Sequence, residues 1–297
     1  MQHSFGNTLV VGASGFVGRA LVKELVGRGV YVVAHARNTD VVLPGVKMRY
    51  GDLNDHAICV ALLQDIQTVI YLAAAKKNIM EHTARPFDFI AENVRPFLTF
   101  AEALKDSSVS ECVYISSTHA EKEWESGTDG YALGKYINEL IVGPLRAQSG
   151  KAISVVRSSA VYGPGDNFNP KTANFIPSLI QRIDESHGEF LVWGTGERKM
   201  QFIYVDDLVE NIIAAVGSAT TLATVGNPEV WSVNDIVSEC MGLFKKEGMI
   251  RHDPTKPDKA TQLFTFANLV SPRIDMKEGL KRVVEYYKAN VAHTTRS

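Results

Sequence analysis

Cysteine is scarce in this sequence, and the few cysteines present form no pattern. Cys59, Cys112 and Cys240 lie far apart and have neither a CxxC nor a metal-ligand spacing. A disulfide framework and a cysteine-based metal centre are therefore excluded. Because unpaired cysteines suit a reducing compartment, we expect a cytoplasmic protein that holds no metal.

Long hydrophobic runs and an excess of charge of one sign are also absent. The apolar stretches are strand-sized, far short of the roughly 20 residues that cross a bilayer. The N-terminus runs into a strand without the pattern of a signal peptide. The net charge of −2 gives no footprint for nucleic acid or a membrane surface. With 45% hydrophobic residues among 297, the sequence predicts one large domain or two closely joined ones.

Short apolar runs alternate with helical patterns through the first half of the chain. The apolar runs are 9–12, 30–34, 47–50, 68–73, 112–116 and 153–157. Helical periodicity covers 16–28, 54–64, 86–104 and 131–148. Uninterrupted apolar runs are typical of strands buried on both faces. The pattern therefore predicts an α/β fold with a Rossmann-type doubly wound parallel sheet.

The rhythm changes beyond Gly163, where prolines and glycines interrupt it. We expect a smaller C-terminal α/β lobe that binds the substrate, and a segment, 202–217, that returns to the main sheet. An amphipathic helix is expected over 276–290. The predicted boundaries are a Rossmann domain over 1–165 with 201–226, and a substrate lobe over 166–200 and 227–297.

A glycine-rich loop stands between the first strand and the first helix. Gly12, Gly15 and Gly18 have the spacing of a dinucleotide-binding turn, in which glycines allow a tight turn and close approach of backbone to a pyrophosphate. The helix N-terminus behind it supplies unpaired N–H groups and partial positive charge. We therefore expect cofactor contacts from Gly12, Ser14, Gly15, Phe16, Val17 and Gly18.

The residues that follow the second strand bear on the choice of cofactor. An NAD site usually places an acidic residue there for the ribose 2′-hydroxyl, whereas segment 34–37 contains no acid and ends in Arg37. A guanidinium can pair with a 2′-phosphate, so we expect NADP rather than NAD. The alternative is that Arg37 is simply a solvated arginine.

Tyr131 and Lys135 are the candidate proton-transfer pair. Four residues apart, they share one face of the predicted helix. A tyrosine titrates near pH ~10, and a neighbouring cation is expected to lower that value towards the working pH. Ser117 ends the preceding strand, where it would hydrogen-bond the same substrate oxygen. The alternative for Ser116 and Ser117 is capping of the strand end.

These motifs together resemble the extended short-chain dehydrogenase/reductase superfamily, also called the NAD-dependent epimerase/dehydratase family. The second half resembles GDP-L-fucose synthases, which are epimerase-reductases, through segments 161–170, 176–180, 192–196, 201–208 and 253–258. The resemblance implies an oxidoreductase in which Tyr131, Lys135 and Ser117 reduce a 4-keto sugar with NADPH. It implies further cofactor contacts from Asp52, Leu53, Ala73, Ala74, Ala75, Asn93, Tyr131, Lys135 and Ser158. It implies substrate contacts from Ser117, Thr118, Asn167, Asn174, Phe175, Arg182, Trp193, Lys199 and Lys256.

The sequence departs from the fucose synthases at the residues that epimerise the sugar. The family's cysteine is His119 here, and its histidine is Asn174, whose amide cannot act as an acid or base. His119 can titrate usefully or merely line the pocket. A family arginine is replaced by Met200, with Arg182, Arg198 and Lys199 nearby as substitutes.

We therefore expect an NADP-dependent reductase of a nucleotide-linked 4-keto-6-deoxysugar, with epimerisation reduced or lost. The alternatives are a nucleotide-sugar 4-epimerase with tightly bound NAD and a cofactor-binding sensor without catalysis. By analogy with the family, we expect a homodimer formed through helix 86–104 and the Tyr131 helix.

Three features beyond these motifs allow more than one interpretation. Asp206 and Asp207 precede a helix expected from Leu208, so we interpret them as N-terminal caps rather than a carboxylate pair or metal ligands. Trp193 and Phe168 can each stack on a nucleotide base or fill the core of the second lobe.

Overall fold

The computed structural model describes residues 5–75, 83–121, 129–246, 248–256 and 260–292. The chain divides into two compact units, each built from several stretches of sequence. Unit 1 comprises 1–158, 209–225 and 268–270, and unit 2 comprises 159–208, 226–267 and 271–297. No helix in the described ranges is both long enough and apolar enough to cross a membrane.

Unit 1 is built on a seven-stranded parallel sheet of order β11-β6-β5-β4-β1-β2-β3. The strands are β1 (Thr8–Val11), β2 (Val32–Ala36), β3 (Lys47–Tyr50), β4 (Thr68–Tyr71), β5 (Glu111–Ser117), β6 (Ala152–Ser158) and β11 (Leu222–Val225). β1, β2 and β4 are buried throughout, as the uninterrupted apolar runs predicted. The predicted Rossmann-type fold is confirmed.

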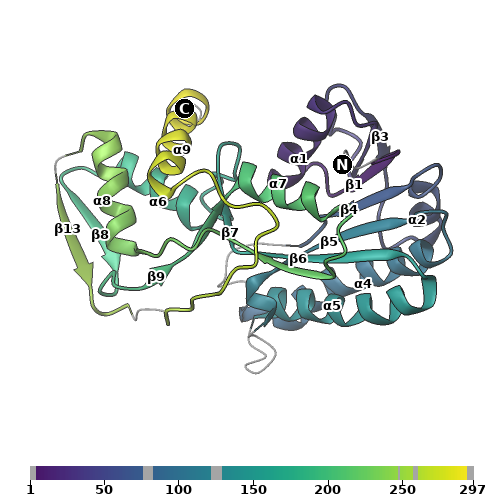
Figure 1. The fold of residues 1–297 in the computed structure, drawn as a ribbon. Helices are drawn as coiled ribbons and strands as arrows, with labels where there is room; N and C mark the ends of the chain where they lie inside the picture. The colour runs from purple at the N-terminus through teal and green to yellow at the C-terminus, as the bar shows by residue number, and fades with distance from the viewer. Residues whose placement is uncertain (1–4, 76–82, 122–128, 247, 257–259, 293–297) are drawn as a thin grey trace. The chain divides into compact units, whose positions relative to one another are not determined.

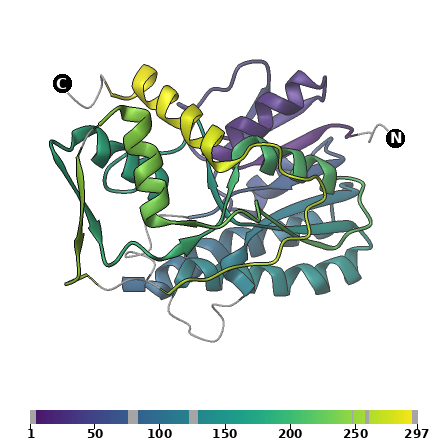
Figure 2. The same cartoon turned by 60° about the vertical axis from the view of Figure 1, so that its left-hand side comes forward.

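Helices cover both faces of this sheet (Figures 1 and 2). On one face lie α2 (His56–Leu62), α4 (Pro86–Lys105) and α5 (Gly130–Ser149), and on the other lie α1 (Phe16–Gly27) and residues 209–215 of α7 (Val205–Ala215). Beneath α4, an aromatic cluster of Tyr71, Phe97, Phe100 and Tyr114 fills the core, with ring centroids 4.6 to 5.9 Å apart. This cluster fixes α4 against β4 and β5, the strands whose ends form the candidate site.

Within its described residues, unit 2 contains three small two-stranded sheets and three helices besides the start of α7. The sheets pair β7 (Ala160–Tyr162) with β10 (Phe202–Tyr204), β9 (Lys199–Met200) with β12 (Trp231–Ser232), and β8 (Glu189–Trp193) with β13 (Met249–Asp253). The helices are α6 (Phe175–Glu185), α8 (Val233–Phe244) and α9 (Met276–Asn290). Phe168 is buried against Tyr286 and Tyr287, so it fills the core of this unit and does not stack on a base.

Two local expectations differ from the structure. Within 202–217, the strand Phe202–Tyr204 pairs with β7, and the seventh strand of the main sheet is formed further on by β11. Helix α7 begins at Val205, so Asp206 and Asp207 lie inside its first turn rather than before it. Asp207 is buried, and its carboxylate accepts hydrogen bonds from the backbone N–H groups of Arg273 and Ile274 at 3.0 and 3.1 Å. Asp207 thus joins the first turn of α7 to the backbone of residues 273–274.

The close approach of α4 and α5 gives the first prediction. A Cβ at Gly130 would lie 2.1 Å from the carbonyl oxygen of Pro86, whereas a Cβ at Gly143, further along α5, meets nothing within 4 Å. We expect Gly130→Ala to lower the free energy of unfolding by about 1–3 kcal/mol. Gly143→Ala should raise it by about 0.5–1 kcal/mol, because alanine favours helix more than glycine does. Urea unfolding of both variants measures the difference; equal effects would contradict the close packing.

Candidate functional site

The loop after β1 has glycines where the backbone leaves no room for a side chain. Gly12 has φ +84°, and a Cβ there would lie 2.7 Å from the backbone nitrogen of Ala73. A Cβ at Gly18 would lie 2.3 Å from the carbonyl oxygen of Gly12. Gly15, before the first residue of α1, supplies no side-chain cap, which leaves the helix N-terminus to an anion. The loop therefore has the cradle that a pyrophosphate requires.

Ser14, Phe16 and Val17 are half-buried along the same loop and first turn. Arg37 is exposed directly after β2. Asp52 is exposed as well, and its carboxylate accepts hydrogen bonds from the backbone and the side-chain amide of Asn54, at 2.9 and 2.8 Å. Asp52 thus shapes its own turn.

Other predicted cofactor residues hold the scaffold. Leu53 belongs to the hydrophobic core of unit 1. Asn93 is buried on α4, where its side-chain amide donates to the carbonyl of Ala75 and accepts from the N–H of Ala75, both at 3.0 Å. Asn93 thereby fixes the backbone that follows β4, including Ala73 and Ala74. Ser158 ends β6, next to Ser117 in the sheet register.

Sequence reasoning missed His35, the fourth residue of β2. Its Nε2–H donates to the carbonyl of Gly51 at 3.0 Å, and its own backbone carbonyl accepts from Ala13 at 3.1 Å. His35 therefore joins the glycine loop to the turn of Asp52. Its side chain is buried, and Nδ1 makes no hydrogen bond. A single histidine within an apolar strand was the available signal.

The burial of His35 gives a pH prediction. Burial lowers the pKa of His35, against the smaller opposing effects of its bond to Gly51 and of the Asp52 carboxylate. The unfolded chain therefore takes up a proton first as the pH falls through about 6.5, the ordinary value, and stability is lost on acidification. The slope contributed by this group is at most about 1.4 kcal/mol per pH unit.

His35→Gln should keep a donor to Gly51 and flatten this pH dependence. Urea unfolding between pH 5 and pH 8, roughly the range in which histidine titrates, measures it. His56→Gln, a change of an exposed histidine on α2, serves as the control. An unchanged slope in the His35 variant would contradict the assignment.

The predicted catalytic groups of unit 1 lie on β5, the short helix η1 (Thr118–Glu121) and α5. Asp129 caps α5 by accepting from the N–H groups of Tyr131 and Ala132, at 3.0 and 3.1 Å. Lys135 is 2% exposed, and its ammonium donates to the carbonyl of Ile115 at 2.7 Å. The same ammonium lies 4.9 Å from the centroid of the Tyr114 ring. A charge held this deeply in the fold is fixed in position.

The pKa of Tyr131 is shifted upward, whereas a downward shift was expected from Lys135. Burial raises the pKa of Tyr131, and the Asp129 carboxylate adds to this shift. Desolvation disfavours the charged phenolate, and the spacing of Tyr131 and Lys135 in the sequence predicts only the effect of the cation. Tyr131 is therefore protonated at neutral pH, in the form that gives a proton to a carbonyl oxygen.

Ser117 and the residues after it begin η1. The Ser117 hydroxyl accepts from the N–H of His119 at 3.3 Å, so it also performs the strand-end capping that was its alternative role. Thr118 is buried, and its hydroxyl makes no hydrogen bond. The hydroxyl of the neighbouring Ser116 is likewise buried without a partner. His119 is half-buried.

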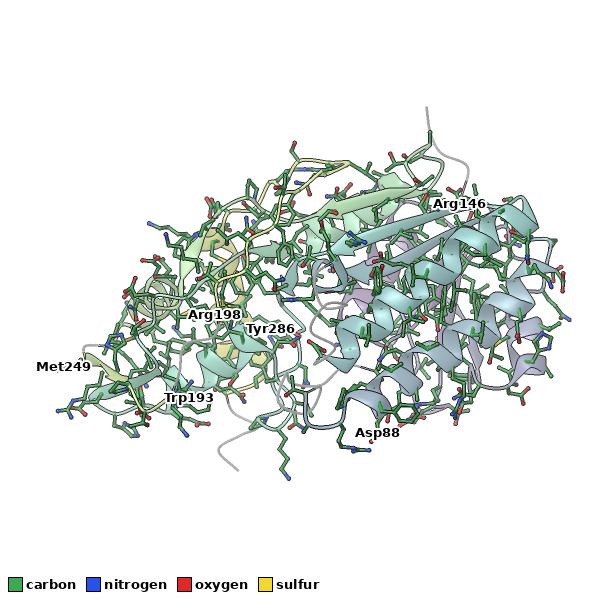
Figure 3. The ribbon with its side chains drawn as sticks, turned by 90° about the horizontal axis from the view of Figure 1, so that it is seen from below. Asp88, Arg146, Trp193, Arg198, Met249 and Tyr286 are labelled. Carbon is green, nitrogen blue, oxygen red and sulfur yellow. The ribbon has the colours of Figure 1, made fainter. Side chains whose placement is uncertain are left out.

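In unit 2, cations gather around an exposed aromatic ring. Trp193 at the end of β8 is 57% exposed (labelled in Figure 3), so it does not fill the core. The Arg182 guanidinium and the Lys256 ammonium lie 5.7 and 5.9 Å from its ring centroid. Arg182 also donates to the carbonyl of Leu191 at 2.7 Å. This arrangement can take a planar base and an anionic group together.

The remaining predicted substrate residues of unit 2 are less clustered. Asn167 donates to the hydroxyl of Thr172 at 2.8 Å, and Asn174 donates to the carboxylate of Asp166 at 3.5 Å, so both amides brace their own loop. Phe175 stacks on Phe202, with ring centroids 6.3 Å apart. Lys199 is exposed on β9.

Arg198 is a further cation that unit 2 holds partly out of solvent. Arg198, labelled in Figure 3, is half-buried and its Nε makes no hydrogen bond. Burial lowers the pKa of its guanidinium. Met200, two residues later, is half-buried and leaves no charge at the family arginine's position.

The sheet order, the glycine cradle and the Tyr131 helix define a Rossmann-fold protein with a dinucleotide-type loop. The chain belongs to the NAD dependent epimerase/dehydratase family, whose model matches residues 8–231. This match confirms the family indicated by the motifs. The chain is an enzyme of this family, and its relatives include proteins named as reductases and synthases.

Among the relatives is a dTDP-4-dehydro-6-deoxy-D-allose reductase of Streptomyces bikiniensis, 27% identical over 94% of this chain and 95% of its own. A probable GDP-L-fucose synthase of Oryza sativa subsp. japonica is 26% identical over 96% of this chain and 93% of its own. A solved UDP-glucose 4-epimerase of Thermotoga maritima superimposes with a TM-score of 0.83 at 20% identity, covering 96% of this chain and 99% of its own.

Proposed function

We propose that this protein is an NADPH-dependent reductase of a nucleotide-linked 4-keto-6-deoxysugar. The observation that carries the proposal is the position of Tyr131 on the same helix as the buried ammonium of Lys135, in surroundings that raise the pKa of the Tyr131 phenol. A reductase needs a proton donor at the carbonyl oxygen, and a tyrosine with a raised pKa retains its proton through the neutral range. Two groups of relatives bear names of keto-deoxysugar reductases and fucose synthases.

The chain's own residues supply binding, orientation and the proton. The turn formed with Gly12 and Gly18 fits a dinucleotide pyrophosphate, since a Cβ at either position would clash with the backbone atoms that shape the turn. When bound, the reduced nicotinamide supplies a hydride. Tyr131 donates its proton to the sugar oxygen, Ser117 donates a hydrogen bond to the same oxygen, and Lys135 stabilises the phenolate that remains.

The sugar nucleotide would be held by unit 2. Trp193 is exposed enough to stack on a base, and Arg182, Lys199 and Lys256 offer positive charge for a diphosphate. Asn174 braces Asp166 and has no acid or base function. We therefore propose reduction without the two-residue epimerisation of fucose synthases, with His119 as the single titratable group left at those positions.

Two properties of the molecule as a whole complete the proposal. Phe87, Leu98 and Leu140 on α4 and α5 are 76%, 44% and 57% exposed, which suits a homodimer formed through these helices. The three cysteines are free and buried, which suits the reducing cytoplasm.

Tyr131→Phe tests the catalytic assignment. The change removes the hydroxyl that donates the proton and leaves the aromatic ring, so we expect kcat to fall by about 10²–10⁴-fold while NADPH affinity is retained. The assay follows loss of reduced-nicotinamide absorbance with GDP- and dTDP-4-keto-6-deoxysugars, and Tyr31→Phe, an exposed tyrosine of unit 1, is the control.

Three outcomes of this assay would contradict the reductase. Consumption with none of these sugars excludes the reaction as proposed. Interconversion of UDP-sugars without net consumption, by protein that purifies with NAD, would indicate a 4-epimerase. Full function in Tyr131→Phe would indicate a sensor.

Arg37→Gln tests the cofactor preference. Loss of a charge-assisted contact to the 2′-phosphate should weaken NADPH binding by about 10–100-fold, since such bonds contribute roughly 1.5–3 kcal/mol, and leave NADH binding unchanged. Isothermal titration with both cofactors measures this, with Lys23→Gln, a change of an exposed cation on α1, as the control. Equal effects on the binding of both cofactors would show that Arg37 does not contact the 2′-phosphate of NADPH.

A further inference from the structure

A buried guanidinium lies behind the predicted catalytic residues of unit 1. Arg157, the residue before the end of β6, has a side chain only 14% exposed. Its Nε donates to both carboxylate oxygens of Glu139 at 3.0 Å, and its Nη2 donates to one of them at 2.7 Å. Glu139 is 10% exposed. This is the forked arrangement in which Arg fixes the direction as well as the distance of a carboxylate.

The third nitrogen of the same guanidinium reaches a second carboxylate. Nη1 of Arg157 lies 3.5 Å from Oε2 of Glu121, the last residue of η1. Glu121 is 49% exposed, so this contact by itself contributes little to stability. The contact nevertheless joins η1 to the same guanidinium that binds Glu139 on α5.

Two of the three charges, Glu139 and Glu121, belong to α5 and η1, which carry predicted catalytic groups, and Arg157 belongs to β6, which pairs with β5. Glu139 follows Lys135 by one helical turn on α5, and Glu121 follows His119 by two residues. Arg157 pairs in register with Ser116, and the next pair is Ser158 with Ser117. A single side chain therefore sets α5 and η1 against the ends of β5 and β6.

Stability does not account for this use of charge. Removing two charges from water is costly, and a well-packed apolar pair at such a place is often neutral or stabilising. Orientation does account for it, because an apolar pair can slide whereas a forked ion pair cannot.

We propose that Arg157 is a positioning residue that fixes the Tyr131 helix relative to Ser117 and His119 through Glu139 and Glu121. The inference rests on the proposed function of Tyr131. Arg157 touches none of the reacting atoms, and its effect is on the geometry in which the proton is transferred. Displacement of about 1 Å in such a geometry can cost 10²-fold in rate.

Unit 1 contains a matched control. Arg28, at the C-terminal end of α1, also pairs with two glutamates, Glu24 at 2.8 Å and Glu210 on α7, but these side chains are more exposed, at 36%, 45% and 24%. This trio has the same composition as the Arg157 trio, and it joins elements that carry none of the predicted catalytic groups.

The experiment compares four variants. Three are the single changes Arg157→Lys, Glu121→Gln and Arg28→Met. The fourth, called the apolar pair, combines Arg157→Met and Glu139→Leu. For each, kcat and KM with the keto sugar, NADPH affinity and urea unfolding are measured. Hydrogen exchange of the backbone amides of 118–121 and 130–135 is followed in parallel.

We expect the apolar pair to fold, to bind NADPH within about twofold of the wild type and to lose about 10–100-fold in kcat. Exchange should rise in both amide segments. Arg157→Lys should recover part of the rate. Glu121→Gln should speed exchange in 118–121 alone, and Arg28→Met should leave rate and exchange unchanged.

Wild-type kcat and unchanged exchange in the apolar pair would overturn the inference and leave the reductase standing. If the wild-type protein reduces no keto sugar, the proposed function fails, and hydrogen exchange alone then decides whether Arg157 holds the two segments. If the apolar pair does not fold, Arg157→Lys decides by the same readouts.

Discussion

The hydrogen bond from the buried ammonium of Lys135 to the carbonyl of Ile115 is the constraint on which the candidate site depends. It ties the helix that carries Tyr131 to the central strand that ends at Ser117. An ammonium taken out of water must keep a strong acceptor, so the bond is costly to break. The distance between α5 and β5 is thereby set at one point, and Asp129 and the Arg157 trio set the direction of the helix on either side of it.

Burial, more than charge, determines the chemistry of this region. Burial of the Lys135 ammonium against β5, the raised pKa of Tyr131 on α5 and the lowered pKa of His35 on β2 all result from loss of solvent. In water, a cation near a phenol would dominate, but inside a fold the loss of solvent can outweigh it. A tyrosine that keeps its proton at neutral pH suits transfer of that proton to a carbonyl.

Local pattern was sufficient for much of the fold. Strand 47–50 and helix 276–290 were predicted to the residue, and the glycines of the loop were predicted from spacing alone. These features depend on neighbours in the sequence. The acceptor of Lys135, the partners of Asp207 and the bonds of His35 lie tens of residues away and depend on tertiary packing. The roles of Ser117, Tyr131 and the substrate residues remain predictions.

The seventh strand has a consequence for how the protein is made. β11 pairs with β6, yet it is translated only after the chain has passed through the first half of unit 2. A ribosome that has released β6 therefore presents a sheet with an open edge for more than sixty residues of synthesis. Pairing across such a separation is intrinsically slow, and the backbone groups of β6 on that side stay open to other strands until residue 225 has emerged.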